Sequence, residues 1–276
     1  MRRSTPSLTP DEARQLHAHA LVIDSQQPPA TTGFLFTERM RTALADLAQR
    51  GMTREDAAPV MVDMATEELI TSASARKAYI DFWRASGVTV ACASYSGTEP
   101  LTRAFEIVNR RIARAYAVVE ALGGEMTLIR TAADIDQTYR DGRAGLVLDF
   151  QNTTPYGEEL DRIEHFRSLG VRMVQLTYNL RNLVGDGCTE TYQGGLSTFG
   201  REVVRRLNAA RTLVDISHCS EQVGWDALSI SSAPVVVSHS TSKALCFHDR
   251  GKTDELARSV ADRGGYFGVV VIPGFI

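Results

Sequence analysis

The sequence predicts an α/β fold built around a parallel barrel of the (β/α)8, or TIM, type. Seven continuous apolar runs occur along the chain, and helical patterns separate them. Parallel strands that helices cover on both faces give continuous apolar runs, whereas half-exposed antiparallel strands alternate. The length of 276 residues is close to the roughly 250 residues of a typical barrel. No low-complexity linker interrupts the pattern, so we expect residues 1–276 to form a single domain.

The amino-terminal part of the chain predicts one strand and then a set of inserted helices. Thr9-Pro10-Asp11-Glu12 combines a capping box with a proline at the first helical position, so a helix should begin at Pro10. The apolar run 21–24 predicts the first strand. Three helical stretches follow between residues 37 and 86, two of them closed by glycine, and the compact β-branched run 87–96 predicts the second strand.

From residue 100 onward, helices and strands alternate. Helices are predicted at about 100–122, 157–170, 199–211, 220–231 and 252–265. Strands are predicted at 144–150, 171–179, 212–218, 233–240 and 266–275. The seventh run ends in GVVVIPGFI with no helix after it, so the eighth βα unit is expected to be missing. We expect either a truncated chain or a barrel left open with two unpaired edges.

The polar residues at the strand ends distinguish a barrel from an open doubly wound sheet. A doubly wound sheet should carry a glycine-rich turn, and no turn here reads G-x-G-x-x-G or GxxxxGK[ST]. Several different strands end in polar or ionisable side chains instead, as around the mouth of a barrel enzyme. These residues are Asp24, Ser94, Gln151, Tyr178, His218 and His239.

Composition and charge exclude several classes of protein. The formal net charge of −3 and the pI of about 6.1 give no electrostatic reason to expect nucleic acid as a partner. No apolar run approaches the ~20 residues of a membrane span, and no apolar segment follows the opening arginines as in a secretion signal. The four cysteines are sparse and form no C-x-x-C pair, which predicts reduced thiols in a cytoplasmic protein.

His218 and His239 are the strongest candidates for chemistry. Each follows an apolar strand and a serine, at the same point of two consecutive βα units. Adjacent strands lie about 4.8 Å apart, so both imidazoles can reach one metal ion. The alternative is a pair of hydrogen-bonded rim histidines that hold no metal. Two histidines suit several transition ions, so the pattern does not name the metal.

Four stretches stand in a characteristic order in the carboxyl-terminal half. They are FRSLGVRMVQLTYNLRNLVGDGC, GGLSTFGREVVRRLN, LVDISHCSEQVGWDALSISSAPVVVSHSTSKALCFHDRGKTDEL and GGYFGVVVIPGFI. In order and spacing they resemble the membrane dipeptidase (renal dipeptidase) family of zinc-dependent barrel hydrolases. The resemblance extends from about residue 144 to the end and, more weakly, from residue 21. It implies zinc, a dipeptide-like substrate and a homodimer.

The resemblance also implies roles for individual residues. His218 and His239 match the two histidine zinc ligands of the family, and Arg250 matches an arginine that grips the carboxylate of the substrate. A guanidinium suits this task because its planar fork bonds a carboxylate bidentately. Tyr178 stands where the family has a histidine beside the tetrahedral centre, and its hydroxyl can donate to an oxyanion. Asn179, next to it, is a second candidate for substrate contact.

The departures from the family are concentrated at the metal centre. The His-x-Asp pair after the first strand is replaced by Gln26 and Pro28, and the glutamate that bridges two ions is replaced by Gln151. A neutral amide can donate one oxygen but cannot bridge two cations as a carboxylate does. A binuclear centre is therefore not expected. We expect instead one ion that is held by His218 and His239, with Gln151 or water as a further ligand.

Two aspartates near this centre can supply a carboxylate. Asp24 matches an aspartate of the family and supports the site or contributes to the metal, and Asp149 lies one layer deeper than Gln151. Phe150-Gln151-Asn152 and Tyr178-Asn179 resemble a divergent bacterial branch of the family.

The sequence therefore supports a dipeptidase-like metallohydrolase that acts on a small carboxylate-bearing substrate through an altered metal centre. Two alternatives remain. One is a catalytically impaired or metal-free barrel with a binding role, and the other is a hydrolase of a non-peptide substrate such as a lactone or an N-acyl compound.

Overall fold

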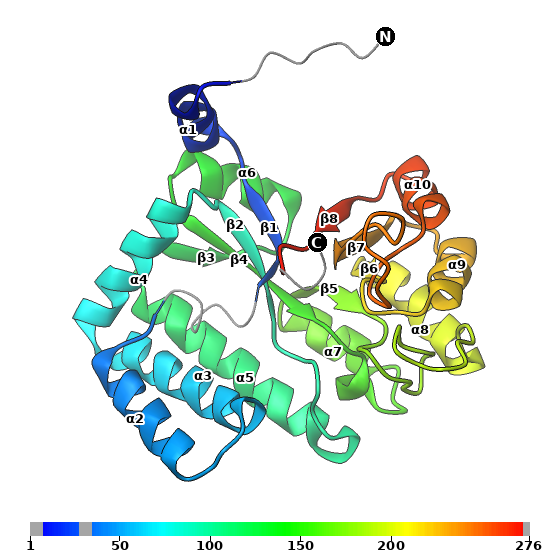
Figure 1. Cartoon of the computed structure of the whole chain (residues 1–276), viewed down its shortest axis with the longest axis horizontal. Coiled ribbons are helices and arrows are strands. Elements are labelled where there is room, and N and C mark those ends of the chain that lie inside the picture. Colours follow the sequence, from blue (N-terminus) through cyan, green and yellow to red (C-terminus); the bar gives the residue numbers. More distant parts are fainter. Residues whose placement is uncertain (1–7, 28–34, 273–276) are drawn as a thin grey trace.

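The strands of the computed structural model, which describes residues 8–27 and 35–272, form one parallel sheet that curls into a nearly closed barrel (Figure 1). Seven strands follow one another in a continuous path and confirm the predicted barrel. They are β1 (Ile23–Gln27), β2 (Val90–Ser94), β4 (Ala144–Phe150), β5 (Val171–Gln175), β6 (Leu213–Asp215), β7 (Val235–Ser240) and β8 (Phe267–Val269).

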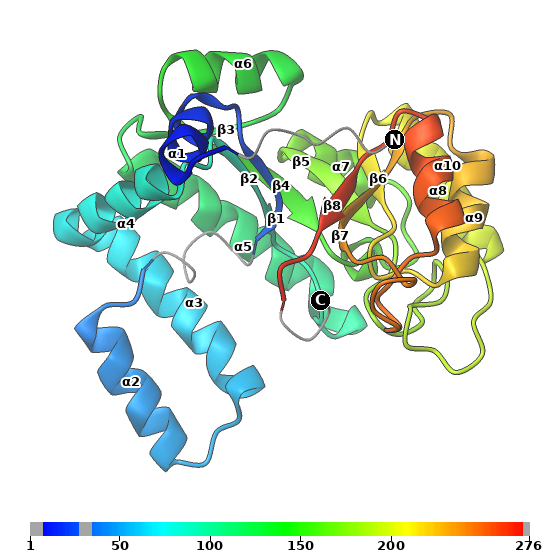
Figure 2. The ribbon, with the colours of Figure 1, turned by 45° about the horizontal axis from the view of Figure 1, so that its top comes forward.

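Helices surround the sheet (Figure 1). Between β1 and β2 lie α2 (Glu38–Gln49), α3 (Arg54–Thr71) and α4 (Ala73–Ser86), and Figure 2 shows α2 and α3 projecting away from the strands. The others are α1 (Pro10–His19), α5 (Leu101–Ala121), α6 (Ala132–Arg140), the 3₁₀ turn η1 (Thr154–Tyr156), α7 (Arg162–Ser168), α8 (Thr198–Ala209), α9 (Glu221–Ile230) and α10 (Asp254–Asp262). None of the helices in the described ranges is long and apolar enough to cross a membrane.

Local signals in the sequence place several helix ends correctly. Thr9 forms the capping box at the start of α1, with its side chain accepting from the backbone of Glu12. Gly87 ends α4 with a φ of +70°, the left-handed conformation that favours glycine. The imidazole of His17 packs against this turn so closely that a Cβ at Gly87 would lie 2.1 Å from it. The turn therefore requires glycine on two grounds.

One strand and one helix were not predicted. β3 (Met126–Leu128) pairs with the first half of β4, and α6 follows it. The strand has only three residues, two of them half-buried, so it forms no continuous apolar run. Several predicted strands are also too long, because β5 ends at Gln175 and β6 at Asp215. Tyr178 and His218 consequently lie on loops beyond the strands.

The two ends of the strand path meet through side chains. The hydroxyl of Ser25 in β1 donates to the carbonyl of Ser238 in β7, with 2.6 Å between the oxygens. A Cβ at Gly268 in β8 would lie 2.7 Å from the same hydroxyl. Among the described residues no backbone pairing joins β1 to β8. Side-chain contacts rather than a strand ladder therefore bridge this seam of the nearly closed barrel.

The interior of the barrel changes from apolar to polar along the strands. Before the carboxyl ends of the strands lies a small apolar cluster, formed by Val90, Cys92, Ile129, Val147, Met173 and Val236. Alternate residues of a strand face the same side, so the position two residues later also points inward. On five neighbouring strands that position is polar: Ser94, Asp149, Gln175, Asp215 and Ser238. This buried polar layer supports the mouth of the barrel.

Candidate active site

The imidazoles of His218 and His239 meet at the carboxyl ends of β6 and β7. The register pairs Asp215 with Val236, so the two histidines, each three residues further on, stand at the same height. Their Nε2 atoms are 2.9 Å apart. Both side chains are buried, at 6% and 8% exposure. The structure thus brings together the two residues that the sequence singled out.

Asp215 determines how the imidazole of His239 is protonated. Its carboxylate accepts four hydrogen bonds, from the backbone N–H and the hydroxyl of Ser217 and of Ser238. Because the Ser238 hydroxyl donates to Asp215 at 2.5 Å, its oxygen is left to accept from Nδ1–H of His239 at 2.7 Å. The proton is then on Nδ1, and Nε2 carries a lone pair.

Asn179 orients His218 in the same way. The Oδ1 atom of Asn179 lies 2.7 Å from Nδ1 of His218 and accepts a hydrogen bond from the Nδ1–H group. The Asn179 carbonyl in turn accepts from the N–H and the hydroxyl of Thr189, at 3.0 and 2.8 Å. A Cβ at Gly187 would lie 2.1 Å from this carbonyl oxygen, so only glycine fits. With both protons assigned to Nδ1, the two Nε2 atoms face each other across 2.9 Å.

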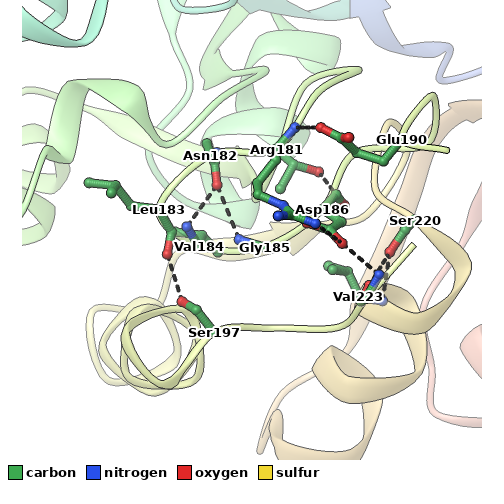
Figure 3. A network of polar contacts seen from close by, with 12 residues as sticks. Arg181, Asn182, Leu183, Val184, Gly185, Asp186, Glu190, Ser197, Ser220 and Val223 are labelled. Atoms are coloured by element: carbon green, nitrogen blue, oxygen red, sulfur yellow. Dashed lines mark hydrogen bonds and ion pairs between the residues drawn. The ribbon is translucent and has the colours of Figure 1, made fainter. Parts of the chain in front are cut away.

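The loop 176–197, which carries Asn179, is ordered by its own polar network (Figure 3). Asp186 accepts from Nε of Arg181 at 2.5 Å, and the Oδ1 of Asn182 accepts from the N–H of Val184 at 2.7 Å. The carbonyl of Asp186 accepts from the N–H of Ser220, the residue that caps α9. The loop is thus attached to the helix that follows His218.

Both histidines are held in the neutral form. Burial lowers the pKa of His218 well below its usual value, and the charges of Arg250 and Lys252 add to this effect. Burial also lowers the pKa of His239 to about 4, although Asp215 acts in the opposite direction. A neutral imidazole whose Nε2 carries a lone pair is the form that binds a metal ion.

Gln151 and Tyr178 complete the surroundings of the histidine pair. The side-chain amide of Gln151 lies 3.2 Å from Nε2 of His239. The ring of Tyr178 stacks on His218, with the ring centres 4.2 Å apart and the planes at 19°. Burial raises the pKa of Tyr178, so its hydroxyl keeps its proton at neutral pH and can donate a hydrogen bond.

Arg250 and Lys252 place two buried positive charges behind this pair. The Arg250 guanidinium donates to the carbonyls of Ser217 and His239, the latter at 3.0 Å. The ammonium of Lys252 donates to the carbonyl of Cys219 at 2.6 Å. The side chains are 3% and 1% exposed, and burial lowers the pKa of each. These backbone contacts make Arg250 part of the framework that holds both histidines.

The hydrogen bonds of Asp24 go to its neighbours in the chain and not to the two histidines. Its carboxylate accepts from the backbone N–H of Gln26 at 3.2 Å and from the side chain of Gln27 at 2.8 Å. Pro28 lies outside the described residues. Within the described ranges, no three His, Cys, Asp or Glu side chains form a cluster that could hold a metal. A metal role for Asp24 therefore remains a prediction.

Asp149 is the least satisfied acid of the polar layer. It is 1% exposed, and neither carboxyl oxygen accepts a hydrogen bond of normal geometry. The nearby hydroxyl of Ser94 donates to the carbonyl of Ser96. Burial raises the pKa of Asp149 well above its usual value, Asp215 adds to this, and Ser94 only partly offsets it. Burial therefore favours the protonated form of Asp149.

Sequence reasoning missed Asp215, Ser238 and Lys252. The signal for the first two was present, because a polar residue two places after an inward-facing apolar one marks the end of the apolar interior. Lys252 gave no such signal, because a lysine in a loop is usually exposed.

A parallel α/β barrel with a polar site at the carboxyl ends of its strands is the architecture of a barrel enzyme. The chain belongs to the membrane dipeptidase family (Peptidase family M19), whose model matches residues 11–276.

Curated relatives align with only part of this chain and with only part of their own length. Dipeptidase tcpJ of Claviceps purpurea is 32% identical over 158 residues, which cover 56% of this chain and 37% of that protein. An uncharacterized protein in the pqqA 5' region of Klebsiella pneumoniae is 28% identical over 170 residues, covering 59% of this chain and 63% of that one. The matches thus span less than two thirds of either relative.

Solved structures share the fold over almost the whole chain. An amidohydrolase from Pseudomonas aeruginosa has a TM-score of 0.69 and 28% identity, covering 93% of this chain and 64% of that one. The probable dipeptidase PvdM from the same organism has a TM-score of 0.73 at 20% identity, covering 96% and 63%. These likenesses place the barrel in the same structural group.

Proposed function

We propose that the protein is a dipeptidase-like hydrolase of a small substrate that bears a free carboxylate, and that it uses one divalent ion, such as zinc. The observation that carries this proposal is the convergence of two Nε2 lone pairs, 2.9 Å apart, on one point at the barrel mouth. Two lone pairs at this separation repel each other unless a cation or a proton lies between them. Family membership supports a metallopeptidase.

The residues present fit one ion and do not fit two. His218 and His239 would supply two nitrogen ligands, and rotation of the Gln151 amide would turn its oxygen to the same point. A second ion needs further anionic ligands. Asp215 is saturated by four donors, and Asp149 lies one layer below Gln151. The altered centre is therefore a mononuclear one in this proposal.

The chain's own residues would bind and orient the substrate. A bound divalent ion supplies Lewis acidity toward the scissile carbonyl. The buried charges of Arg250 and Lys252 favour an anionic substrate group beside His218, with the Arg250 guanidinium as the carboxylate anchor. Tyr178 would donate its hydroxyl proton in a hydrogen bond to the developing oxyanion, and Asn179 would hold His218 in place while contacting the substrate.

Zinc titration of the metal-free protein tests the ligand assignment. We expect one zinc ion per chain in the wild type, and none retained after gel filtration in His218→Ala or His239→Ala. The control is His165→Ala, because His165 is exposed and bonds Asn109 on the outside of the barrel. Full zinc retention by either site variant would overturn the assignment.

Activity assays separate the proposed function from its alternatives. We expect dipeptide hydrolysis that depends on added zinc and is lost in both histidine variants. No zinc above background and no hydrolysis with zinc would favour a metal-free barrel with a binding role. Hydrolysis of lactones or N-acyl compounds but not of dipeptides would instead assign a non-peptide substrate.

Gln151→Glu tests why the centre holds a single ion. A carboxylate in place of the amide supplies the negative charge that the site lacks, so we expect zinc to bind at least tenfold more tightly or in higher stoichiometry. Gln137→Glu adds the same charge on the exposed face of α6 and should leave zinc binding unchanged. Unchanged zinc binding in Gln151→Glu would show that Gln151 is not a metal ligand.

The location and the assembly state rest on separate grounds. All four cysteines are unpaired in the structure, which supports the proposed cytoplasmic location. A homodimer remains a prediction from the family resemblance. Sedimentation of the purified protein would measure it directly.

A further inference from the structure

Four arginines gather far from the histidine pair, near the amino-terminal ends of β5 and β6. We name Arg130, Arg167, Arg172 and Arg211 the arginine cluster. They come from four segments: the turn after β3, the end of α7, the second residue of β5, and the turn between α8 and β6. His218 and His239 lie at the carboxyl ends of the neighbouring strands β6 and β7. The cluster is therefore separate from the candidate active site.

Backbone carbonyls fix Arg172 at the centre of the cluster. Its Nε donates to the carbonyl of Arg130 at 2.7 Å, and its Nη1 donates to those of Arg167 and Val171, each at 2.9 Å. These bonds hold the chain segments of three cluster members together. The side chain is half-buried, so the guanidinium cannot swing freely into solvent.

Arg167 and Arg130 are each held by a hydrogen bond from one nitrogen of the guanidinium group. Arg167 donates through Nε to the carbonyl of Ala210, the neighbour of Arg211, at 2.7 Å. Arg130 donates through Nη2 to the hydroxyl of Tyr116 at 2.6 Å. Arg211 adopts a φ of +53°, the left-handed region that is costly for a residue with a side chain. The remaining guanidinium N–H groups are available to a ligand.

No carboxylate of the described residues forms an ion pair with the cluster, since none lies within 4.0 Å of the four guanidinium groups; Asp134 acts on Arg172 only from a greater distance. Arg206, on the same helix that precedes Arg211, contrasts with them because it binds both Asp161 and Glu164. Asp134 is nearby, but its carboxylate caps α6 by accepting from the backbone of Arg130 and Thr131.

The arginines also repel one another. Burial, together with the charges of Arg167 and Arg130, lowers the pKa of Arg172 to about 10. Burial likewise lowers the pKa of Arg167, with Arg211 and Arg130 acting in the same direction. A bound anion would relieve both the repulsion and the unmet hydrogen-bonding capacity.

We propose that the arginine cluster is a binding site for a small anion that carries phosphate groups. Several guanidinium forks from different segments match the many oxygens and multiple charges of a phosphate ester or diphosphate, whereas a single carboxylate needs only one fork. The site lies at the amino-terminal ends of the strands, at the opposite end of the barrel from its mouth, so it is independent of the hydrolytic function proposed above.

Calorimetric titration with inorganic pyrophosphate, at constant ionic strength, tests the proposal. We expect saturable binding at one site and a rise in the melting temperature beyond that given by sodium chloride of equal ionic strength. Arg211→Gly should weaken binding at least tenfold. This variant also removes the strained φ, so it should melt at or above the wild-type temperature without ligand, which shows that it folds.

Two further variants make the result specific. Arg130→Gln should weaken binding to a similar extent, and Arg205→Gln, which removes an exposed arginine of α8 paired with Glu202, should not change it. Wild-type affinity in both cluster variants would overturn the proposal, because pyrophosphate would then bind elsewhere, for example beside Arg250. A melting temperature no higher than in sodium chloride would overturn it too. Binding of polyglutamate without binding of pyrophosphate would identify a protein-docking surface instead.

Discussion

Asp215 on β6 and Asp149 on β4 belong to the same polar layer and are equally buried, each 1% exposed, yet their surroundings differ completely. Asp215 accepts four hydrogen bonds, and Asp149 accepts none of normal geometry. A buried acid is stable either as a well-bonded anion or as a neutral acid whose pKa is raised. The difference shows that the hydrogen bonds of the buried polar layer are concentrated on the β6–β7 side of the barrel.

The same asymmetry extends to the mouth above the two aspartates. On the β6–β7 side, Ser238 and Asn179 present two imidazole lone pairs to one point. On the β1–β4 side, Asp24 is satisfied by the neighbouring glutamines and Gln151 is neutral. One half of the site thus presents imidazole nitrogens to a cation, and the described residues of the other half offer no comparable set of ligands for a second one.

The largest expected effect comes from replacing each aspartate in turn by asparagine. In Asp215→Asn the amide oxygen can still serve the three donors that bond Oδ1, but an NH2 group faces the Ser238 hydroxyl that Oδ2 serves. Unfolding in urea should show a loss of about 1 to 3 kcal/mol, the cost of one buried donor left unpaired. Asp149→Asn removes a carboxyl that has no such partners, and its stability should stay within about 1 kcal/mol of the wild type. Equal losses in the two variants would contradict the comparison.

A second test concerns the orientation of His239. Ser238→Ala removes the acceptor of the Nδ1 proton and leaves the imidazole in place, so zinc affinity should fall about 10- to 100-fold, the usual range for the partner of a metal-binding histidine. Zinc competition with a chromophoric chelator measures this. Ser229→Ala on α9, whose hydroxyl bonds only the carbonyl of Asp226, is the control. Affinity equal to the wild type in Ser238→Ala would show that Asp215 does not act on the site through Ser238.

The smallest expected effect is a pH dependence of stability due to Lys252. Burial lowers its pKa in the folded state, so the unfolded chain binds more protons between the folded pKa and the unfolded value of about 10.4. Stability should therefore rise with pH in this window, by at most about 1.4 kcal/mol per pH unit. Lys252→Met should show a flatter profile in chemical unfolding between pH 7 and 10. An identical slope in both proteins would contradict a charged, buried Lys252.

Much of the framework follows from local sequence patterns. The continuous apolar runs predict the seven strands of the path, and the Ser-His pairs at two equivalent strand ends predict that His218 and His239 meet. The capping box at Thr9 and the glycine after α4 specify helix ends through interactions within a few residues. Such features depend on neighbours in the chain, so the residues themselves carry the information.

Only the tertiary structure determined the contacts between residues that are distant in the sequence. Asn179 reaches His218 only because a loop folds back under the constraint of Gly187, and Asp215 reaches Ser238 only through the register of β6 and β7. The backbone contacts of Arg250 and the convergence of the arginine cluster arise in the same way. The sequence by itself determined the barrel and its histidines. The histidine tautomers, the different surroundings of Asp149 and Asp215, and the arginine cluster depend on burial and on long-range contacts, which no local pattern contains.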